Sequence, residues 1–254
     1  MTNKPDYIQD YPINTTLLDT NQALSLTGLL NLLQDVGAEH ADILNAGNDF
    51  CIQNNVFWVF TQQRLRIERI PVYKEVLTIK TWLRNIGGIS SVRDYALFVG
   101  DEQIASGCSQ FLLLDGKTHR PQRLSRFADL LPEHSIEPND FDTRKIVLPE
   151  TMNAVQEHTV TTGDLDHNQH VNNTKYTQWV LDSLPLEQQQ KQVCEYETNF
   201  IAQTFLGDKV LCYSDFATDS PADTNTDSLS DTIHFKVNNA DTDKTLFTSR
   251  IVYR

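Results

Sequence analysis

The chain has 254 residues, a length that accommodates one large domain or two small ones around a buried core. Hydrophobic residues make up 39% and charged residues 22% of it, no apolar run approaches the ~20 residues that span a bilayer, and residues 1–7 lack the apolar core of a signal peptide. We therefore expect a cytoplasmic globular protein. The net charge of −13 argues against nucleic acid or an anionic membrane as the main partner.

The first half of the chain predicts a helix followed by strands. Apolar residues recur at near-helical spacing over residues 24–47, with a candidate N-cap at Ser25. Residues 116–155 contain several prolines and little periodicity, so we interpret them as a connection. Alternation of apolar and polar residues predicts a four-stranded antiparallel meander over residues 56–70, 76–83, 92–99 and 104–114.

The second half predicts the same order of elements. A helix is expected over residues 173–184, where Pro185 ends it. Residues 217–230 are rich in Asp, Ser and Thr, which is typical of a solvated hairpin loop. Strand patterns occur at residues 193–204, 209–217, 231–238 and 244–253.

One short segment of each half matches the other at a constant offset. Leu-Asp-Thr-Asn-Gln-Ala at residues 18–23 aligns with Leu-Asp-His-Asn-Gln-His at residues 165–170, and each precedes the helix of its half. Self-similarity at a fixed offset favours duplication. Because His170 stands where the first copy has Ala23, we expect the chemistry in the second half.

The second copy contains a carboxylate, an amide and an imidazole at Asp166, Asn168 and His170. In an extended segment this spacing places the three side chains on one side. The helix that follows presents free backbone N–H groups and the positive end of its dipole, which suit a developing oxyanion. A carboxylate, an imidazole and oxyanion donors are what hydrolysis of an ester or thioester requires.

Two other interpretations fit part of the same stretch. Asp164, Asp166 and Asn168 match the first three ligand positions of an EF-hand calcium loop, but Gln169 and Lys175 stand where that loop needs Gly and Glu. The other interpretation is an Asp- and Asn-rich loop that only caps a helix, which the His-Val-Asn-Asn and Tyr-x-x-Trp that follow disfavour. We expect no metal ion and no cofactor.

Residues 164–179 read Asp-Leu-Asp-x-Asn-Gln-His-Val-Asn-Asn-x-x-Tyr-x-x-Trp, which closely resembles the signature of plant and bacterial acyl-acyl-carrier-protein thioesterases. The resemblance implies an α+β fold, a tandem or double hotdog with two antiparallel sheets, each wrapped around a central helix. It implies an N-terminal hotdog with the acyl-chain pocket at residues 1–120, a linker at 121–155 and a C-terminal hotdog with the catalytic loop at 156–254. The implied activity is hydrolysis of acyl-[acyl carrier protein], releasing free fatty acid in fatty acid biosynthesis.

The roles of the family's residues carry over to this motif position by position. Asp166 would be the catalytic carboxylate, as a general base or as a nucleophile. Asn168 and His170 would orient the thioester carbonyl and assist proton movement. We expect Asn172 and Asn173, at the start of the following helix, to contact the substrate.

The family also has a Glu-Cys pair on the strand after the catalytic helix, and this chain departs from that pattern. Counting back from Asp208, Gln203 falls at the Glu position and Thr204 at the Cys position. Gln203 can orient a water molecule but cannot act as a base, and the missing Cys disfavours a cysteine nucleophile. For the acyl chain, Trp58 and Phe60 are candidates for the pocket wall, with plain core packing as the alternative.

The resemblance implies acyl carrier protein as the partner, and the acidity of that protein calls for a local basic patch. Two basic clusters are candidates, although a solvated surface run explains each equally well. They comprise Lys117, Arg120, Arg123 and Arg126, and Arg64, Arg66 and Arg69. The alternative functions are an acyl-coenzyme A thioesterase and a non-hydrolytic acyl-binding or dehydratase-like hotdog protein. One chain supplies both halves, so the sequence is compatible with a monomer or a homodimer.

Overall fold

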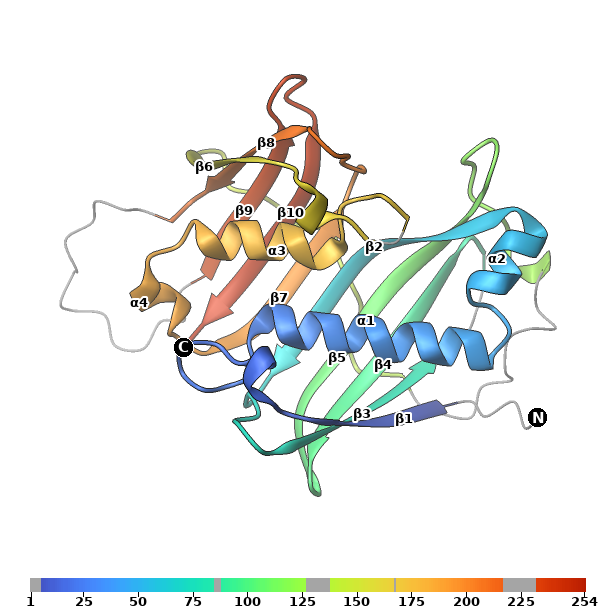
Figure 1. Cartoon of the computed structure of the whole chain (residues 1–254), viewed down its shortest axis with the longest axis horizontal. Coiled ribbons are helices and arrows are strands. Elements are labelled where there is room, and N and C mark those ends of the chain that lie inside the picture. The colour runs from blue at the N-terminus through green and yellow to red at the C-terminus, as the bar shows by residue number, and fades with distance from the viewer. Residues whose placement is uncertain (1–5, 85–87, 127–137, 167, 217–231) are drawn as a thin grey trace. The chain divides into compact units, whose positions relative to one another are not determined.

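The computed structural model describes residues 6–84, 88–126, 138–166, 168–216 and 232–254 (Figure 1). The chain divides into two compact units, Met1–Thr143 and Arg144–Arg254, called unit 1 and unit 2. The hairpin loop predicted at residues 217–230 lies outside the described residues. Within the described ranges, no helix is long and apolar enough to cross a membrane.

Unit 1 is an antiparallel sheet with a long helix lying across one face (Figure 1). Hydrogen bonding gives the strand order β1-β3-β4-β5-β2. In chain order the elements are β1 (Asp6–Pro12), a 3-10 turn η1 (Thr15–Leu17), α1 (Leu26–Ile43), α2 (Asn48–Asn54), β2 (Val56–Ile67), β3 (Val76–Leu83), β4 (Ser90–Val99) and β5 (Glu102–Asp115).

The predicted strands of unit 1 are confirmed, but the predicted meander is wrong in two respects. Strand β2 pairs with β5 and not with the next strand in the chain, β3. Strand β1, which the sequence pattern did not predict, precedes the helix and pairs with β3. Alternating polarity marks a strand and its two faces, but it does not determine which neighbour the strand joins.

Helix α1 forms because its start is capped and one of its faces is apolar. The Ser25 hydroxyl accepts a hydrogen bond from the Gly28 amide at 3.0 Å. The helix is shorter than the predicted 24–47, because Asn45 adopts a left-handed φ of 54° soon after its end and a separate helix, α2, begins at Asn48. The buried residues of the apolar face include Leu29, Leu33 and Val36.

Part of the segment after β5 is held against the sheet of unit 1 by polar side chains. The Asn139 side-chain amide donates to the Gly107 carbonyl at 2.7 Å and to Asp94 at 3.2 Å. Arg84 donates to the buried Asp94 carboxylate at 2.6 Å and to the Phe141 carbonyl at 2.6 Å. A buried carboxylate that is paired and hydrogen-bonded in this way fixes the path of the chain at the end of unit 1.

Unit 2 has the same plan. Its strand order is β6-β8-β9-β10-β7. The elements are β6 (Asn153–Thr159), a 3-10 turn η3 (Thr162–Asp164), α3 (Asn173–Asp182), α4 (Leu186–Gln189), β7 (Val193–Phe200), β8 (Lys209–Ser214), β9 (Thr232–Asn239) and β10 (Thr245–Tyr253). Strand β6 begins within the stretch predicted as a connection, and it was not predicted because its residues are mostly polar and show no strand pattern.

The two units therefore repeat one topology, in which a first strand, a helix and further strands occupy corresponding places in the sheet. Helix α3 packs through aromatic residues: Tyr176 and Trp179 are each only 3% exposed, and the Tyr176 ring stacks on Phe247 with centroids 5.3 Å apart. Both aromatic side chains are therefore part of the core of unit 2.

Candidate active site

The loop between η3 and α3 carries the predicted acid, amide and imidazole, and it closes on itself. The Asp166 amide donates to the His170 carbonyl at 2.8 Å, and the Gln169 amide donates to the Asp166 carbonyl at 3.1 Å. Leu165 and Val171 form an isolated antiparallel bridge. Gln169 has a φ of 63°, a backbone conformation that residues other than glycine adopt uncommonly.

The Asp166 carboxylate is turned towards the backbone of its own loop. Its Oδ1 accepts hydrogen bonds from the amides of Asn168 at 2.8 Å and His170 at 3.2 Å. Within the described part of the chain, no hydrogen bond joins the side chains of Asp166, Asn168 and His170 to one another. Asn168 is exposed, and Asp166 and His170 are half-buried.

The expectation of an extended segment is therefore wrong. The hydrogen bonds from Asp166 to His170 make residues 166–170 a tight turn, so a spacing of two residues does not by itself align the side chains. What the loop does bring together is an anchored carboxylate and a half-buried imidazole, directly before a helix. Residue 167 of the motif lies outside the described residues.

The matching segment of unit 1 has the same loop without the imidazole. The Asp19 amide donates to the Ala23 carbonyl at 2.8 Å, and Asp19 Oδ1 accepts from the amides of Asn21 at 2.8 Å and Ala23 at 3.2 Å. Gln22 has a φ of 59°. Because unit 1 forms this loop with an alanine at the position of His170, the loop geometry does not depend on the histidine.

The start of α3 follows the loop at once. Asn172 is the N-cap, and its side-chain oxygen accepts the Thr174 amide at 3.0 Å. The Lys175 amide donates to the Asn172 carbonyl at 2.9 Å. The described residues offer no acceptor to the amide of Asn173, the first residue of the helix. That N–H group is therefore a donor at the positive end of a helix.

A second segment, residues 201–208 after β7, runs beside this loop. The Val171 amide donates to the Thr204 carbonyl at 3.2 Å. The ring of Phe205 meets the imidazole of His170 edge to face, with centroids 5.3 Å apart. Gln203 is exposed and directly precedes Thr204. The segment predicted to hold the family's Glu-Cys position thus lies next to the loop, although within the described residues no hydrogen bond joins the Gln203 side chain to the loop.

Thr204 is buried and is already engaged by a helix residue. The Tyr176 hydroxyl donates to Thr204 Oγ1 at 2.7 Å, and burial raises the pKa of Tyr176 to about 12. Within the described ranges no basic side chain is hydrogen-bonded to Thr204, so its hydroxyl is not activated as a nucleophile. Burial also raises the pKa of Cys212 to about 12, so this thiol is not a thiolate at neutral pH.

A group of side chains around the buried Asp164 supports the loop from the side of η3. The Asp164 carboxylate accepts the Thr161 amide at 2.7 Å, the Thr161 hydroxyl at 2.9 Å and the His158 Nε2 at 3.0 Å. The His158 ring packs on Trp179 with centroids 4.7 Å apart. Burial alone would raise the pKa of Asp164, but these hydrogen bonds outweigh it and hold that pKa below its usual value.

This supporting group also bears on the calcium interpretation. Asp164 is directed to Thr161 and His158, whereas Asp166 is directed to the amides of its own loop. The two carboxylates that would have to share a cation thus have separate partners. The sequence pattern predicted a role for neither His158 nor Phe205, because each meets the loop region through a contact that no contiguous motif contains.

The predicted acyl-chain residues lie in unit 1. The Trp58 indole N–H donates to the Ala46 carbonyl at 2.9 Å, and the ring packs beside Phe50 and Leu113. Phe60 stacks on Phe111 with centroids 5.0 Å apart. Trp58 and Phe60 are both half-buried, so each combines packing with some accessible surface.

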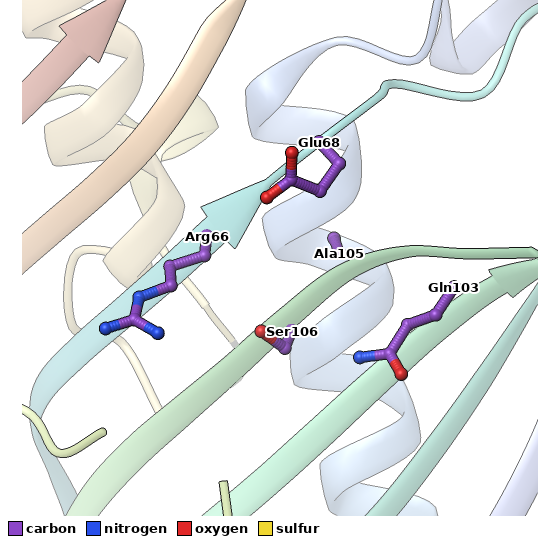
Figure 2. A pocket seen from close by; sticks show the side chains of 5 residues that line it. All are labelled: Arg66, Glu68, Gln103, Ala105 and Ser106. Atoms are coloured by element: carbon purple, nitrogen blue, oxygen red, sulfur yellow. The ribbon is translucent and has the colours of Figure 1, made fainter. Parts of the chain in front are cut away.

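Unit 1 also has an open pocket of about 280 Å³ on β2 and β5, lined by Arg66, Glu68, Gln103, Ala105 and Ser106 (Figure 2). In Figure 2 the helix α1 lies behind these strands. The lining is mainly polar or charged, and it includes none of the predicted catalytic or acyl-chain residues, although Arg66 belongs to the second basic cluster. Such a surface does not suit a fatty chain, which binds in apolar surroundings.

Solved structures identify the class to which this fold belongs. The chain is similar to an acyl-ACP thioesterase from Bacteroides thetaiotaomicron, with 20% identity, a TM-score of 0.85 and 100% of both chains covered. It is also similar to the 12:0-ACP thioesterase from Umbellularia californica, with 15% identity, a TM-score of 0.82 and coverage of 99% and 95%. The predicted α+β double hotdog is thereby confirmed.

Family models then identify the family. Acyl-ACP thioesterase N-terminal and C-terminal domains match residues 4–127 and 149–249. The chain belongs to the acyl-ACP thioesterase family, as the motif at residues 164–179 predicted. One curated relative is the chloroplastic oleoyl-acyl carrier protein thioesterase of Coriandrum sativum, 28% identical over 71% of this chain and 54% of that protein. The chain spans about half the length of the curated relatives it matches.

Proposed function

We propose that this chain hydrolyses the thioester of acyl-[acyl carrier protein] and releases a free fatty acid. The observation that carries the proposal is the loop of unit 2, which holds Asp166 and His170 directly before α3 in a member of this thioesterase family. The same loop in unit 1 has no imidazole at the corresponding position, Ala23. Residence in the cytoplasm remains a prediction from the sequence.

Hydrolysis adds water to the thioester carbonyl and expels a thiol, and each step moves a proton. The Asp166 Oδ1 is occupied by two loop amides, while its Oδ2 accepts no hydrogen bond from the described residues. Oδ2 is therefore the atom that takes the proton of the attacking water or attacks directly. His170 carries a proton towards the leaving thiolate. A positioned base or acid contributes about 10²–10⁴-fold to such a rate.

The negative charge that develops on the carbonyl oxygen needs hydrogen-bond donors. The Asn173 amide at the start of α3 and the exposed side-chain amide of Asn168 supply them in this proposal. A donor of this kind contributes about 3 kcal/mol to the transition state. Asn172 contributes by capping α3 with its side chain, which fixes the start of that helix. Gln203 orients the attacking water.

The partner in this proposal is acyl carrier protein, and its docking surface is the cluster Lys117, Arg120, Arg123 and Arg126, which is exposed throughout. Within the described residues, Lys117, Arg120 and Arg123 make no ion pair with a carboxylate. We assign the fatty chain to unit 1, beside Trp58 and Phe60.

The second basic cluster is less suited to docking, because two of its three arginines, Arg66 and Arg69, are already paired with carboxylates. Arg66 donates to both oxygens of Asp140 at 3.0 and 3.2 Å. Arg69 pairs with Glu75 at 2.8 Å and with Glu102 at 3.4 Å. Both guanidinium groups would have to leave these carboxylates to meet an acidic partner, so the structure favours the cluster at residues 117–126.

The proposal is tested by release of free thiol from matched acyl-[acyl carrier protein] and acyl-coenzyme A substrates over a series of chain lengths. We expect a higher kcat/KM for the carrier-bound substrates. A higher value for coenzyme A would reassign the substrate, and no thiol release from either would refute a hydrolase. The His170→Ala variant should lose most activity, whereas a variant of the corresponding residue in unit 1, Ala23→Ser, should retain it.

A further inference from the structure

The turn at residues 205–208 of unit 2 places an aromatic ring against the imidazole of the candidate site. The Phe205 amide donates to Asp208 Oδ2 at 2.9 Å, and the Asp208 amide returns a bond to the Phe205 carbonyl at 3.1 Å. The preceding carbonyl, of Thr204, accepts the Val171 amide from the loop itself. The backbone of Phe205 is thus fixed relative to the loop that carries His170.

The exposure of Phe205 is unusual for so large an apolar side chain. Its side chain is 48% exposed, yet its ring contacts the ring of His170 edge to face. Aromatic pairs prefer this geometry, and the contact restricts the orientations of the smaller ring. Within the described residues no carboxylate is hydrogen-bonded to this half-buried imidazole, so another group has to fix its direction.

Unit 1 contains the same turn without the ring. The Val72 amide donates to Glu75 Oε2 at 2.8 Å, and the Glu75 amide donates to the Val72 carbonyl at 3.1 Å. The carbonyl before it, of Pro71, accepts the Leu24 amide at 2.8 Å. Val72 therefore occupies the position of Phe205, just as Ala23 occupies the position of His170.

The two differences between the units occur together. Where the loop carries an imidazole, the neighbouring turn carries a phenyl ring, and where the loop carries a methyl group, the turn carries a valine. The turn itself forms in both units, so folding does not require the ring. Its presence is explained by what it does to His170.

We propose that Phe205 is a positioning residue for His170, which holds the imidazole in the orientation needed to transfer a proton at the thioester. This inference rests on the proposed hydrolase function. Phe205 touches neither the substrate nor the reacting atoms in this role; it acts through His170. A small misplacement of a catalytic group lowers the rate without weakening substrate binding, so the effect should fall on kcat.

The test compares three variants of the full chain. Phe205→Leu keeps an apolar side chain without the ring, and we expect kcat to fall about tenfold with KM nearly unchanged. Phe205→Tyr restores a ring and should restore kcat. Val72→Leu, the matched change in unit 1, should have no effect. If Phe205 served instead as an apolar contact for the acyl chain, Phe205→Leu would retain kcat and change KM.

A second readout does not depend on activity. The NMR signals of the His170 ring protons should carry a ring-current shift that Phe205→Leu removes and Phe205→Tyr keeps. An active wild-type protein whose kcat is unchanged in Phe205→Leu overturns this inference and leaves the proposed function intact. A wild-type protein that releases no thiol overturns the proposed function, and the role of Phe205 falls with it, even where the ring-current shift is observed.

Discussion

The carboxylates of Asp19 and Asp166 bind the same two amide positions of their loops, two and four residues ahead, at 2.8 and 3.2 Å in both units. Asp166 thus has a structural role that Asp19 shares and a proposed chemical role that Asp19 lacks. Comparison of the two positions separates these roles within one chain.

Replacement of either residue by alanine should remove the two hydrogen bonds and lower the free energy of unfolding by about 1 kcal/mol. Asparagine keeps an oxygen that can accept both bonds, so Asp19→Asn and Asp166→Asn should cost less. Only Asp166→Asn should reduce kcat, by about 10²-fold or more. Urea denaturation and a thiol-release assay measure the two effects. Equal activity of Asp19→Asn and Asp166→Asn would contradict a chemical role of Asp166.

Asp164 should make stability depend on pH in the acidic range. Its pKa in the folded protein lies below the ordinary 3.8, so its contribution is present above the unfolded pKa and is lost as the pH falls through the folded pKa. We expect Asp164→Asn to lower the free energy of unfolding by about 1–3 kcal/mol at pH 7. The difference from wild type should shrink below pH ~4. A difference that stays constant down to pH 2 would exclude this linkage.

Charge reversal at Arg120, Arg123 and Arg126 should weaken docking of the acidic carrier. We expect the triple Glu variant to raise KM for acyl carrier substrates about tenfold or more, while hydrolysis of a small soluble thioester is unchanged. The effect should diminish at high salt, because exposed charges are screened. A control variant reverses three exposed lysines of unit 2, Lys145, Lys191 and Lys244. An equal rise in KM in this control would remove the docking site from residues 117–126.

The hydrogen bond from Tyr176 to Thr204 should stabilise unit 2. Thr204→Val leaves the buried Tyr176 hydroxyl without its acceptor, and we expect a loss of about 1–3 kcal/mol in the free energy of unfolding. Tyr176→Phe should lose a similar amount. The double variant should lose less than the sum of the two, because neither polar atom remains unpaired. Strict additivity in thermal or urea unfolding would show that the two side chains do not interact.

Much of the fold could be predicted from local pattern. The apolar residues that follow Ser25 at helical spacing predicted α1. Pro185 predicted the end of α3 to within a few residues. The order of strands could not be predicted, because a strand such as β2 has the same alternation whichever neighbour it joins. Strands β1 and β6 were not predicted because neither is strongly apolar or shows a clear alternation of apolar and polar residues.

In the candidate site, too, features of contiguous residues could be predicted and contacts between distant residues could not. The motif predicted the loop, its helix and the family, which are properties of contiguous residues. It did not predict that the Asp166 carboxylate bonds to its own backbone, since i, i+2 spacing has this outcome only in a tight turn. Contacts such as that of His170 with Phe205 join residues that are far apart in the sequence, and no local pattern encodes them.

The loop of unit 1 has one more consequence. This turn forms with Ala23 at its fifth position and is held by the hydrogen bonds of Asp19, so its backbone can present a different side chain at position 23. The double variant Ala23→His, Val72→Phe would test whether the turn of unit 1 can carry an imidazole and its aromatic neighbour without a loss in the free energy of unfolding. The loop of unit 1 therefore serves as an internal control, because a substitution in the loop of unit 2 can be compared with the same substitution in unit 1.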